Sequence, residues 1–233
     1  MLNQGCSNIP RELCDWITIL GKSLPLRAAR TCLELLIGAM LTRSGFVTQS
    51  WLVLNTQKHW TSYYKCLQQG KWSWLALARA FVRLVIQEVS AEIVYLAIDD
   101  TLVLRASKKA PASQIHHQHG NKPNLARYVR GQCWVTLAQI ATRAQGKNIA
   151  IPLLSRLMPT AGNTGKLRAA QTLMRSVSRL YSGKTVRLLV DSWYMRGEFI
   201  LAMLSKKIDV IGQVRYDTRL YDTPAVRKKK QRG

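Results

Sequence analysis

The stretch from Ile93 to Thr101 reads Ile-Val-Tyr-Leu-Ala-Ile-Asp-Asp-Thr. A run rich in Ile, Val and Tyr, apolar at successive positions, is typical of a strand that is buried on both faces of a sheet. The run ends in two carboxylates, Asp99 and Asp100. We therefore expect a central strand whose C-terminal end opens into a functional site.

Acidic residues are scarce, which makes the position of each one informative. The chain has 12 Asp and Glu against 35 Lys and Arg, and no acid lies between Asp100 and Asp191. Asp191 ends a second apolar run, Val186 to Val190, which predicts another strand. Neighbouring parallel strands lie about 4.8 Å apart, so acids at equivalent strand ends can share a metal ion. The alternatives are that Asp99 caps a turn or helix and that Asp191 caps a helix beginning near Trp193.

The length and charge of the chain restrict the class of protein. With 233 residues, of which 47% are hydrophobic, the chain can bury a substantial core. A net charge of +23 favours an anionic partner. Because this charge is spread through segments that should fold, nucleic acid fits better than a membrane surface.

Cysteine usage and hydropathy indicate the compartment. The five cysteines lie far apart and form no Cys-x-x-Cys pair, which fits reduced thiols better than disulfides or a zinc site. The N-terminus has no signal-peptide pattern, and the longest apolar run near the start, Leu35 to Leu41, is too short to cross a bilayer. The sequence therefore predicts a cytoplasmic protein without a membrane segment.

Residues 1–90 are predicted to form a helical N-terminal region, with DNA binding as its expected role. Apolar residues recur every three or four positions between Leu26 and Leu41, which predicts an amphipathic helix, and Trp74 to Val89 predicts another. Between them, Lys58 to Trp74 interleaves aromatic and basic side chains, which can stack on bases and neutralise phosphates. The alternative is that these aromatic residues form the core of a helical layer.

Residues 91–226 are predicted to form an α/β domain with a mixed sheet and flanking helices. The expected elements after the first strand are a short strand at 102–105, strands at 132–141, 148–158, 186–190 and 208–214, and helices at 166–181 and 193–205. Ala106 to Arg130 is predicted to be a polar, basic loop. Its three histidines, His116, His117 and His119, have no further Cys or carboxylate nearby to complete a metal site.

Basic residues in and after this loop are the candidate DNA contacts, since phosphates are neutralised by Lys and Arg. The candidates are Lys108, Lys109, Lys122, Arg127, Arg130, Arg168, Arg175 and Arg179. Residues 227–233 are predicted to form a separate basic tail.

Several of these segments together resemble the DDE transposases encoded by bacterial insertion sequences. The resemblance rests on Ala97 to Thr101 and on Leu189 to Tyr194, which are similar to the catalytic core of that family. His59 to Trp74 is similar to the family's N-terminal helical region, and Gln213 to Lys229 to the segment after its fifth core strand. The resemblance therefore covers the chain from about residue 25 onward.

The resemblance implies a ribonuclease H-like fold and metal-dependent chemistry on DNA. It places the first catalytic aspartate at Asp100, with Asp99 as the less favoured alternative, and the second at Asp191. Family members use two divalent ions, Mg²⁺ or Mn²⁺, to cleave the phosphodiester at the transposon end and to drive strand transfer into target DNA. No small-molecule cofactor is implied, and a homodimer is one option for the assembly.

The sequence departs from the family at the third catalytic residue, a glutamate on a helix after the last core strand. Glu198 is on an earlier element, and Asp209, Asp217 and Asp222 lie on or beside strands. The chain therefore looks like a transposase cut short, with impaired cleavage. The alternative is a non-catalytic DNA-binding fragment that occupies transposon ends or regulates an intact transposase. A third interpretation, an RNA- or ribosome-associated protein, explains the charge but not the two aspartates.

Overall fold

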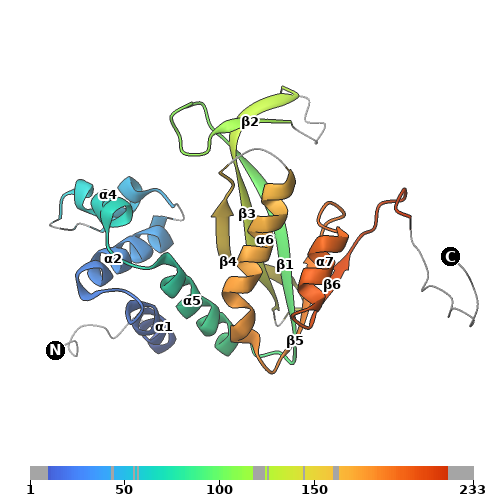
Figure 1. The fold of residues 1–233 in the computed structure, drawn as a ribbon. Coiled ribbons are helices and arrows are strands. Elements are labelled where there is room, and N and C mark those ends of the chain that lie inside the picture. The colour runs from blue at the N-terminus through green and yellow to red at the C-terminus, as the bar shows by residue number, and fades with distance from the viewer. Residues whose placement is uncertain are drawn as a thin grey trace, which may run out of the picture.

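The computed structural model describes residues 10–42, 45–54, 56, 58–117, 124, 126–143, 145–159 and 163–219. Within these ranges a group of helices precedes the sheet (Figure 1). They are α1 (Arg11–Gly21), α2 (Leu26–Thr42), α3 (Val47–Val53), α4 (Trp60–Gln69) and α5 (Trp74–Glu88). None of the described helices is long and apolar enough to cross a membrane.

A six-stranded mixed sheet and its covering helices make up the second part of the molecule. The elements in chain order are β1 (Ile93–Leu104), β2 (Gln114–His117), β3 (Tyr128–Thr142), β4 (Asn148–Leu157), α6 (Asn163–Val177), the short 3₁₀ helix η1 (Ser178–Tyr181), β5 (Thr185–Val190), α7 (Gly197–Leu204) and β6 (Ile208–Gly212).

The strands combine an antiparallel meander with parallel crossovers. β3 pairs antiparallel with β1, β2 and β4, whereas β5 pairs parallel with β1, and β6 parallel with β5. Apart from the short β2, the order across the sheet is β4-β3-β1-β5-β6. The parallel crossovers are made by helices, as such connections require. This arrangement confirms the expected α/β class with a ribonuclease H-like sheet behind a helical N-terminal region.

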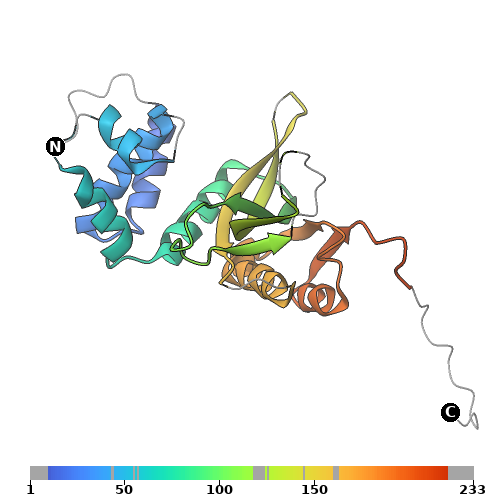
Figure 2. The same cartoon turned by 90° about the horizontal axis from the view of Figure 1, so that it is seen from above.

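Helices cover one face of the sheet, where the main core lies. Val94, Leu96 and Ile98 alternate along β1 and are buried, as the two-residue period of a strand predicts. They belong to one apolar cluster with residues of α6 such as Leu173 and Met174. Figure 2 shows α6 and α7 side by side on this face.

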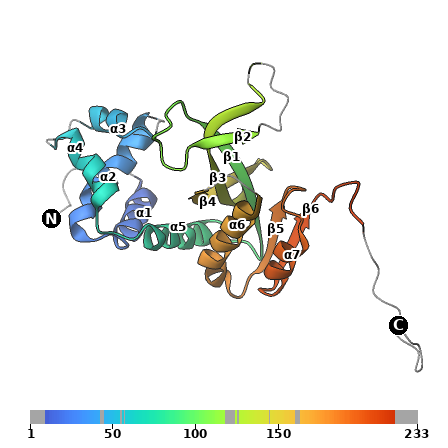
Figure 3. The same cartoon turned by 45° about the horizontal axis from the view of Figure 1, so that its top comes forward.

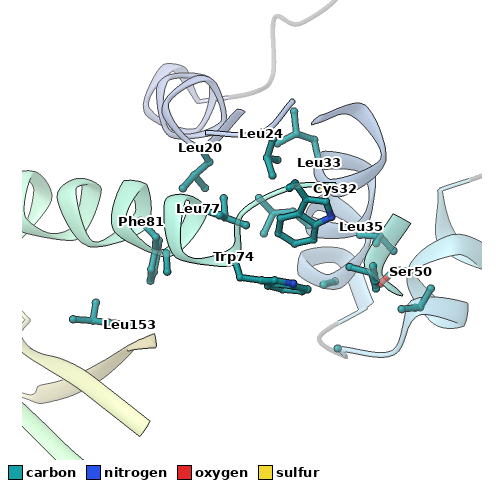
Figure 4. A pocket seen from close by; sticks show the side chains of 17 residues that line it. Leu20, Leu24, Cys32, Leu33, Leu35, Ser50, Trp74, Leu77, Phe81 and Leu153 are labelled. Carbon is teal, nitrogen blue, oxygen red and sulfur yellow. The ribbon is translucent and has the colours of Figure 1, made fainter. Parts of the chain in front are cut away.

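Helix α5 joins the two parts of the molecule (Figure 3). Its residues Val82 and Val85 belong to the core cluster of the sheet. Leu77 and Phe81 line an apolar cavity of about 460 Å³ that is bordered mainly by the N-terminal helices (Figure 4). Phe81 also packs against the core cluster of the sheet. The division into domains at residue 90 stays a prediction, and the predicted tail, residues 227–233, lies outside the described residues.

Three expected elements differ in the structure. The polar loop after β1 contains a strand, β2, because His116 and its neighbours pair with the start of β3. The short strand expected at 102–105 is the continuation of β1 to Leu104. The helix expected from Trp193 begins only at Gly197, because a turn held by Asp191 comes first.

Candidate active site at the carboxyl ends of β1 and β5

The parallel pairing of β1 with β5 brings the predicted acids to the same end of the sheet. Ile98 is opposite Val190 in the register, so Asp99 and Asp191 each come one residue after this last pair. Asp100 comes one residue later on β1. Side chains alternate between the two faces of a strand, so Asp99 and Asp100 point to opposite faces.

Asp100 lies on the face that the helices cover, and both of its carboxylate oxygens have partners. The Lys166 ammonium of α6 forms an ion pair with Oδ2 at 2.7 Å. The Tyr194 hydroxyl donates to Oδ1 at 3.2 Å, and the Cys133 thiol lies 3.6 Å from Oδ2. Ligating carboxylates are often fixed by such neighbouring donors, so this side chain is well oriented for binding.

Asp191 is exposed and shapes the turn that follows β5. Its Oδ1 accepts hydrogen bonds from the backbone N–H groups of Trp193 at 3.0 Å and of Tyr194 at 3.2 Å. Tyr194 therefore contacts both acids, because its backbone N–H binds Asp191 while its hydroxyl binds Asp100. The capping role considered for Asp191 is present, at this turn rather than at a helix.

Asp99 is exposed at the strand end, and its Oδ1 accepts a hydrogen bond from the backbone N–H of Asp100 at 2.7 Å. Partial burial raises the pKa of the Asp99 carboxyl, and the negative charges of Asp100 and Asp191 raise this pKa further. The Asp100 N–H and the Lys166 charge oppose this rise without cancelling it. Three carboxylates thus influence one another at this end of the sheet.

The hydroxyl of Tyr194 and the thiol of Cys133 remain protonated near neutral pH. Burial, followed by the nearby Asp100 charge, raises the pKa of the Tyr194 hydroxyl far above its usual range, so Tyr194 stays a donor. Burial, again followed by Asp100, raises the pKa of Cys133 to about 11. The Lys166 ammonium also lies 5.2 Å from the centre of the Trp193 ring, a cation–π contact.

Two hard oxygen donors of this kind suit Mg²⁺ or Mn²⁺, which prefer carboxylate and water. Within the described residues, however, no group of three or more His, Cys, Asp or Glu side chains converges on one point. Glu198 is in the first turn of α7, Asp209 is on β6, and Asp217 pairs with Arg215. Asp222 and His119 lie outside the described residues.

The predicted DNA contacts fall into two groups. Lys108, Lys109, Arg127 and Arg130 lie beyond β1 and at the start of β3, whereas Arg168, Arg175 and Arg179 lie on α6 and η1. All are exposed except Arg130, which is half-buried and donates to the Ser113 carbonyl. None belongs to an ion pair recorded for the described chain. Lys122 lies outside the described residues.

Sequence reasoning did not find Lys166, Tyr194 or Cys133. Tyr194 had a weak signal, because a polar aromatic residue three positions after a strand-end acid can fold back over it. Lys166 and Cys133 had no signal in the sequence, because they come close to Asp100 only when α6 packs on the sheet and β3 pairs with β1.

A comparison with models of protein families identifies the family of this chain. A family model described as a DDE superfamily endonuclease matches residues 20–233. This chain therefore belongs to the DDE superfamily endonucleases. A search of curated proteins finds no match.

A search of solved structures finds a piggyBac transposase in a synaptic complex with hairpin DNA. The two chains are 18% identical, and the TM-score is 0.34. The match covers 68% of this chain and 31% of that one.

Proposed function

We propose that this chain is a DNA transposase of the DDE type, whose reaction is metal-dependent phosphodiester cleavage followed by strand transfer of an insertion sequence. Membership of the DDE superfamily endonucleases supports the class of reaction. The net charge of +23 supports a polyanionic substrate. The proposal takes Mg²⁺ or Mn²⁺ as the ion, DNA as the partner and the cytoplasm as the compartment. Residues 1–90 are proposed to bind DNA, and a homodimer is one option for the assembly.

The observation that carries the assignment of the site is the position of Tyr194 between two acids. It donates to Asp100 through its hydroxyl and to Asp191 through its backbone N–H, so one residue fixes both carboxylates at neighbouring strand ends. We assign Asp100 and Asp191 as the residues that would hold the metal. Asp99 is the rival for the first position, because it is level with Asp191 in the strand register.

When bound, a divalent ion at such carboxylates activates the attacking oxygen and stabilises the leaving oxygen of the phosphodiester. The chain itself contributes orientation, since Tyr194 and Cys133 hold the Asp100 carboxylate in place. Lys166 contributes a positive charge 2.7 Å from Asp100, which offsets the repulsion among the acids. This ammonium competes with a metal ion for the same carboxylate.

Two carboxylates hold a pair of metal ions incompletely, so we expect a polypeptide of these 233 residues to cleave DNA weakly. That expectation favours the second candidate function, a non-catalytic DNA-binding protein that occupies transposon ends or regulates an intact transposase. The Lys166 ion pair gives it specific support, because it satisfies one acid without a metal. Both functions predict salt-dependent DNA binding, and they differ in metal-dependent cleavage.

The assignment can be tested by Mn²⁺ binding, followed by electron paramagnetic resonance and by calorimetry. Asp100→Asn and Asp191→Asn should each weaken binding at least about tenfold, because each removes a charged oxygen ligand. Asp99→Asn removes the same charge one residue away and is the matched control, with a smaller loss expected. If Asp99→Asn weakens Mn²⁺ binding more than Asp100→Asn does, Asp99 rather than Asp100 is the first metal-binding aspartate.

Lys166→Met should strengthen Mn²⁺ binding, because it removes the competing ammonium while keeping much of the apolar stem. Unchanged binding in all of these variants would rule out a metal site here. Cleavage of a labelled transposon end in Mg²⁺ then separates the two functions. Strong cleavage would exclude the non-catalytic function. Salt-dependent DNA binding without cleavage would favour the non-catalytic function.

A further inference from the structure

A second pocket opens at the amino ends of β5 and β6, the opposite end of these strands from Asp191. It is bounded by the turn from η1 into β5 and by the turn from α7 into β6, and its volume is about 480 Å³. Four basic residues, Arg179, Lys184, Lys206 and Lys207, are among its lining residues, and no carboxylate is. Parallel pairing of β5 with β6 brings these two basic turns together.

The charge of this pocket is left largely uncompensated by the protein. None of the four cations belongs to an ion pair found among the described residues. Lys184 is oriented by donating to the Ala91 carbonyl at 3.0 Å. Two acids lie near these turns. The Glu92 carbonyl accepts a hydrogen bond from the backbone N–H of Thr185 at the start of β5, and Asp209 comes two residues after Lys207. The side chains of both acids are exposed. Glu92 and Asp209 therefore reduce the positive charge without removing it.

The backbone at Lys207 gives an independent reason to expect a role for this side chain. Its φ is 59°, in the left-handed region that favours glycine. The equivalent turn before β5 uses Gly183, with φ of 82°. A lysine in this conformation is strained relative to glycine, and strained residues are typical of functional sites. The positive charge that Lys207 adds to the pocket accounts for a lysine here.

We propose that this pocket binds a phosphate of the DNA backbone, at a contact separate from the carboxylate site. β5 has six residues, which places its two ends about 20 Å apart at roughly 3.3 Å per residue. The phosphates of one strand of a duplex repeat about every 3.4 Å along the helix axis, so a phosphate bound here is several base pairs from one bound near Asp191. The pocket would therefore add affinity without contacting the reacting phosphodiester. This inference rests on the proposed function only in taking DNA as the ligand.

The test is fluorescence anisotropy with a labelled 30-base-pair duplex in EDTA, so that binding is independent of the metal site. The Lys206→Gln/Lys207→Gln double variant should reduce the slope of log affinity against log salt by about 1 to 2, and affinity at 0.1 M salt by about tenfold or more. The matched control is Arg143→Gln/Lys147→Gln, which removes the same charge from exposed positions in and beside the β3–β4 turn. An equal loss in both double variants, or an unchanged slope in the pocket variant, would overturn the proposal.

Lys207→Gly separates binding from folding. Glycine relieves the left-handed backbone, so this variant should melt at a higher temperature while binding DNA more weakly. A stabilised variant that binds DNA as tightly as the original chain would count against the pocket. Mn²⁺ binding, measured on the same variants, should stay unchanged. If the original chain does not bind Mn²⁺, the proposed metal site is wrong, but the comparison of DNA binding between these variants is unaffected. The two proposals can therefore fail independently.

Discussion

The N-terminal helices and the sheet use apolar side chains very differently. Helix α2 has 17 residues, of which only Ala28, Thr31 and Gly38 are buried. The paired parts of β1 and β5 instead alternate between buried and more exposed residues, and Leu96, Leu137 and Leu188 of the central strands are fully buried. The sheet thus has a close-packed core, whereas the helices surround the apolar cavity of about 460 Å³ in Figure 4.

Polar contacts and close backbone approach compensate for this loose packing. The Glu34 carboxylate of α2 accepts hydrogen bonds from Lys58 at 3.0 Å and from the buried Tyr63 at 2.9 Å, and it also pairs with Arg30. Gly38 of α2 lies directly against Ser50 of α3. The helical region therefore depends on a few specific contacts, and its stability should respond to acid through Glu34.

The largest effect should come from the core of the sheet. Leu188→Ala should lower the free energy of unfolding by about 3 to 4 kcal/mol, because the site cannot collapse around the missing atoms. Leu33→Ala, beside the cavity, should cost only about 1 to 2 kcal/mol, since fewer contacts are lost. Urea denaturation measures both changes. Equal losses would show that the helices are as tightly packed as the sheet.

A steric change should affect the helices next most strongly. A Cβ at residue 38 would lie 2.7 Å from both the Cβ and the carbonyl oxygen of Ser50. Gly38→Ala should therefore cost about 2 kcal/mol and speed hydrogen exchange in α2 and α3 more than in β1. Gly45→Ala is the control, because nothing lies within 4 Å of its added Cβ. Faster exchange in β1 alone would contradict this account.

Acid should weaken the helical region through Glu34. Burial alone raises the pKa of this carboxyl, but hydrogen bonds from Lys58, Tyr63 and Arg30 outweigh it and hold the pKa below 4.5. A lowered folded-state pKa adds stability that is present above the unfolded-state value and is lost as pH falls through the folded-state value. Hydrogen exchange in α2 and α4 should therefore accelerate as pH falls below about 4.5, after correction for the intrinsic rate.

Glu34→Gln should remove this pH dependence and cost about 1 to 2 kcal/mol at neutral pH, because the amide accepts weaker hydrogen bonds from Lys58. Thermal melting at pH 7 and at pH 4 measures both effects. If the variant keeps the pH dependence of the original chain, another carboxyl is responsible.

The smallest effect should come from Arg30. It forms an i,i+4 ion pair with Glu34 at 2.9 Å, but its side chain is 82% exposed. Arg30→Ala should lower stability by only about 0.3 to 0.5 kcal/mol, and less at high salt. Urea denaturation at low and at high salt measures this difference. A loss as large as that of Glu34→Gln would mean that Arg30, rather than Lys58 and Tyr63, holds the carboxylate.

Local patterns predicted the elements that carry the fold. The apolar run before Asp99 gave β1, the run before Asp191 gave β5, and helical spacing after residue 166 gave α6, although its last turn is a 3₁₀ helix. Strand β2 was missed because only four residues form it and its pairing with β3 stabilises it. The delayed start of α7 was missed because a side-chain cap on Asp191 competes with helix formation.

Composition and local periodicity were enough to predict the succession of strands and helices along the chain, the excess of positive charge and the two acids at strand ends, because these features depend on residue type and on near neighbours. The folded chain was needed to show that Lys166, Tyr194 and Cys133 surround Asp100, and that two basic turns form one pocket at the other end of β5. These arrangements depend on strand register and on the packing of α6 and α7. Strand register and helix packing join residues that are far apart in the sequence, so no short stretch of sequence reveals them.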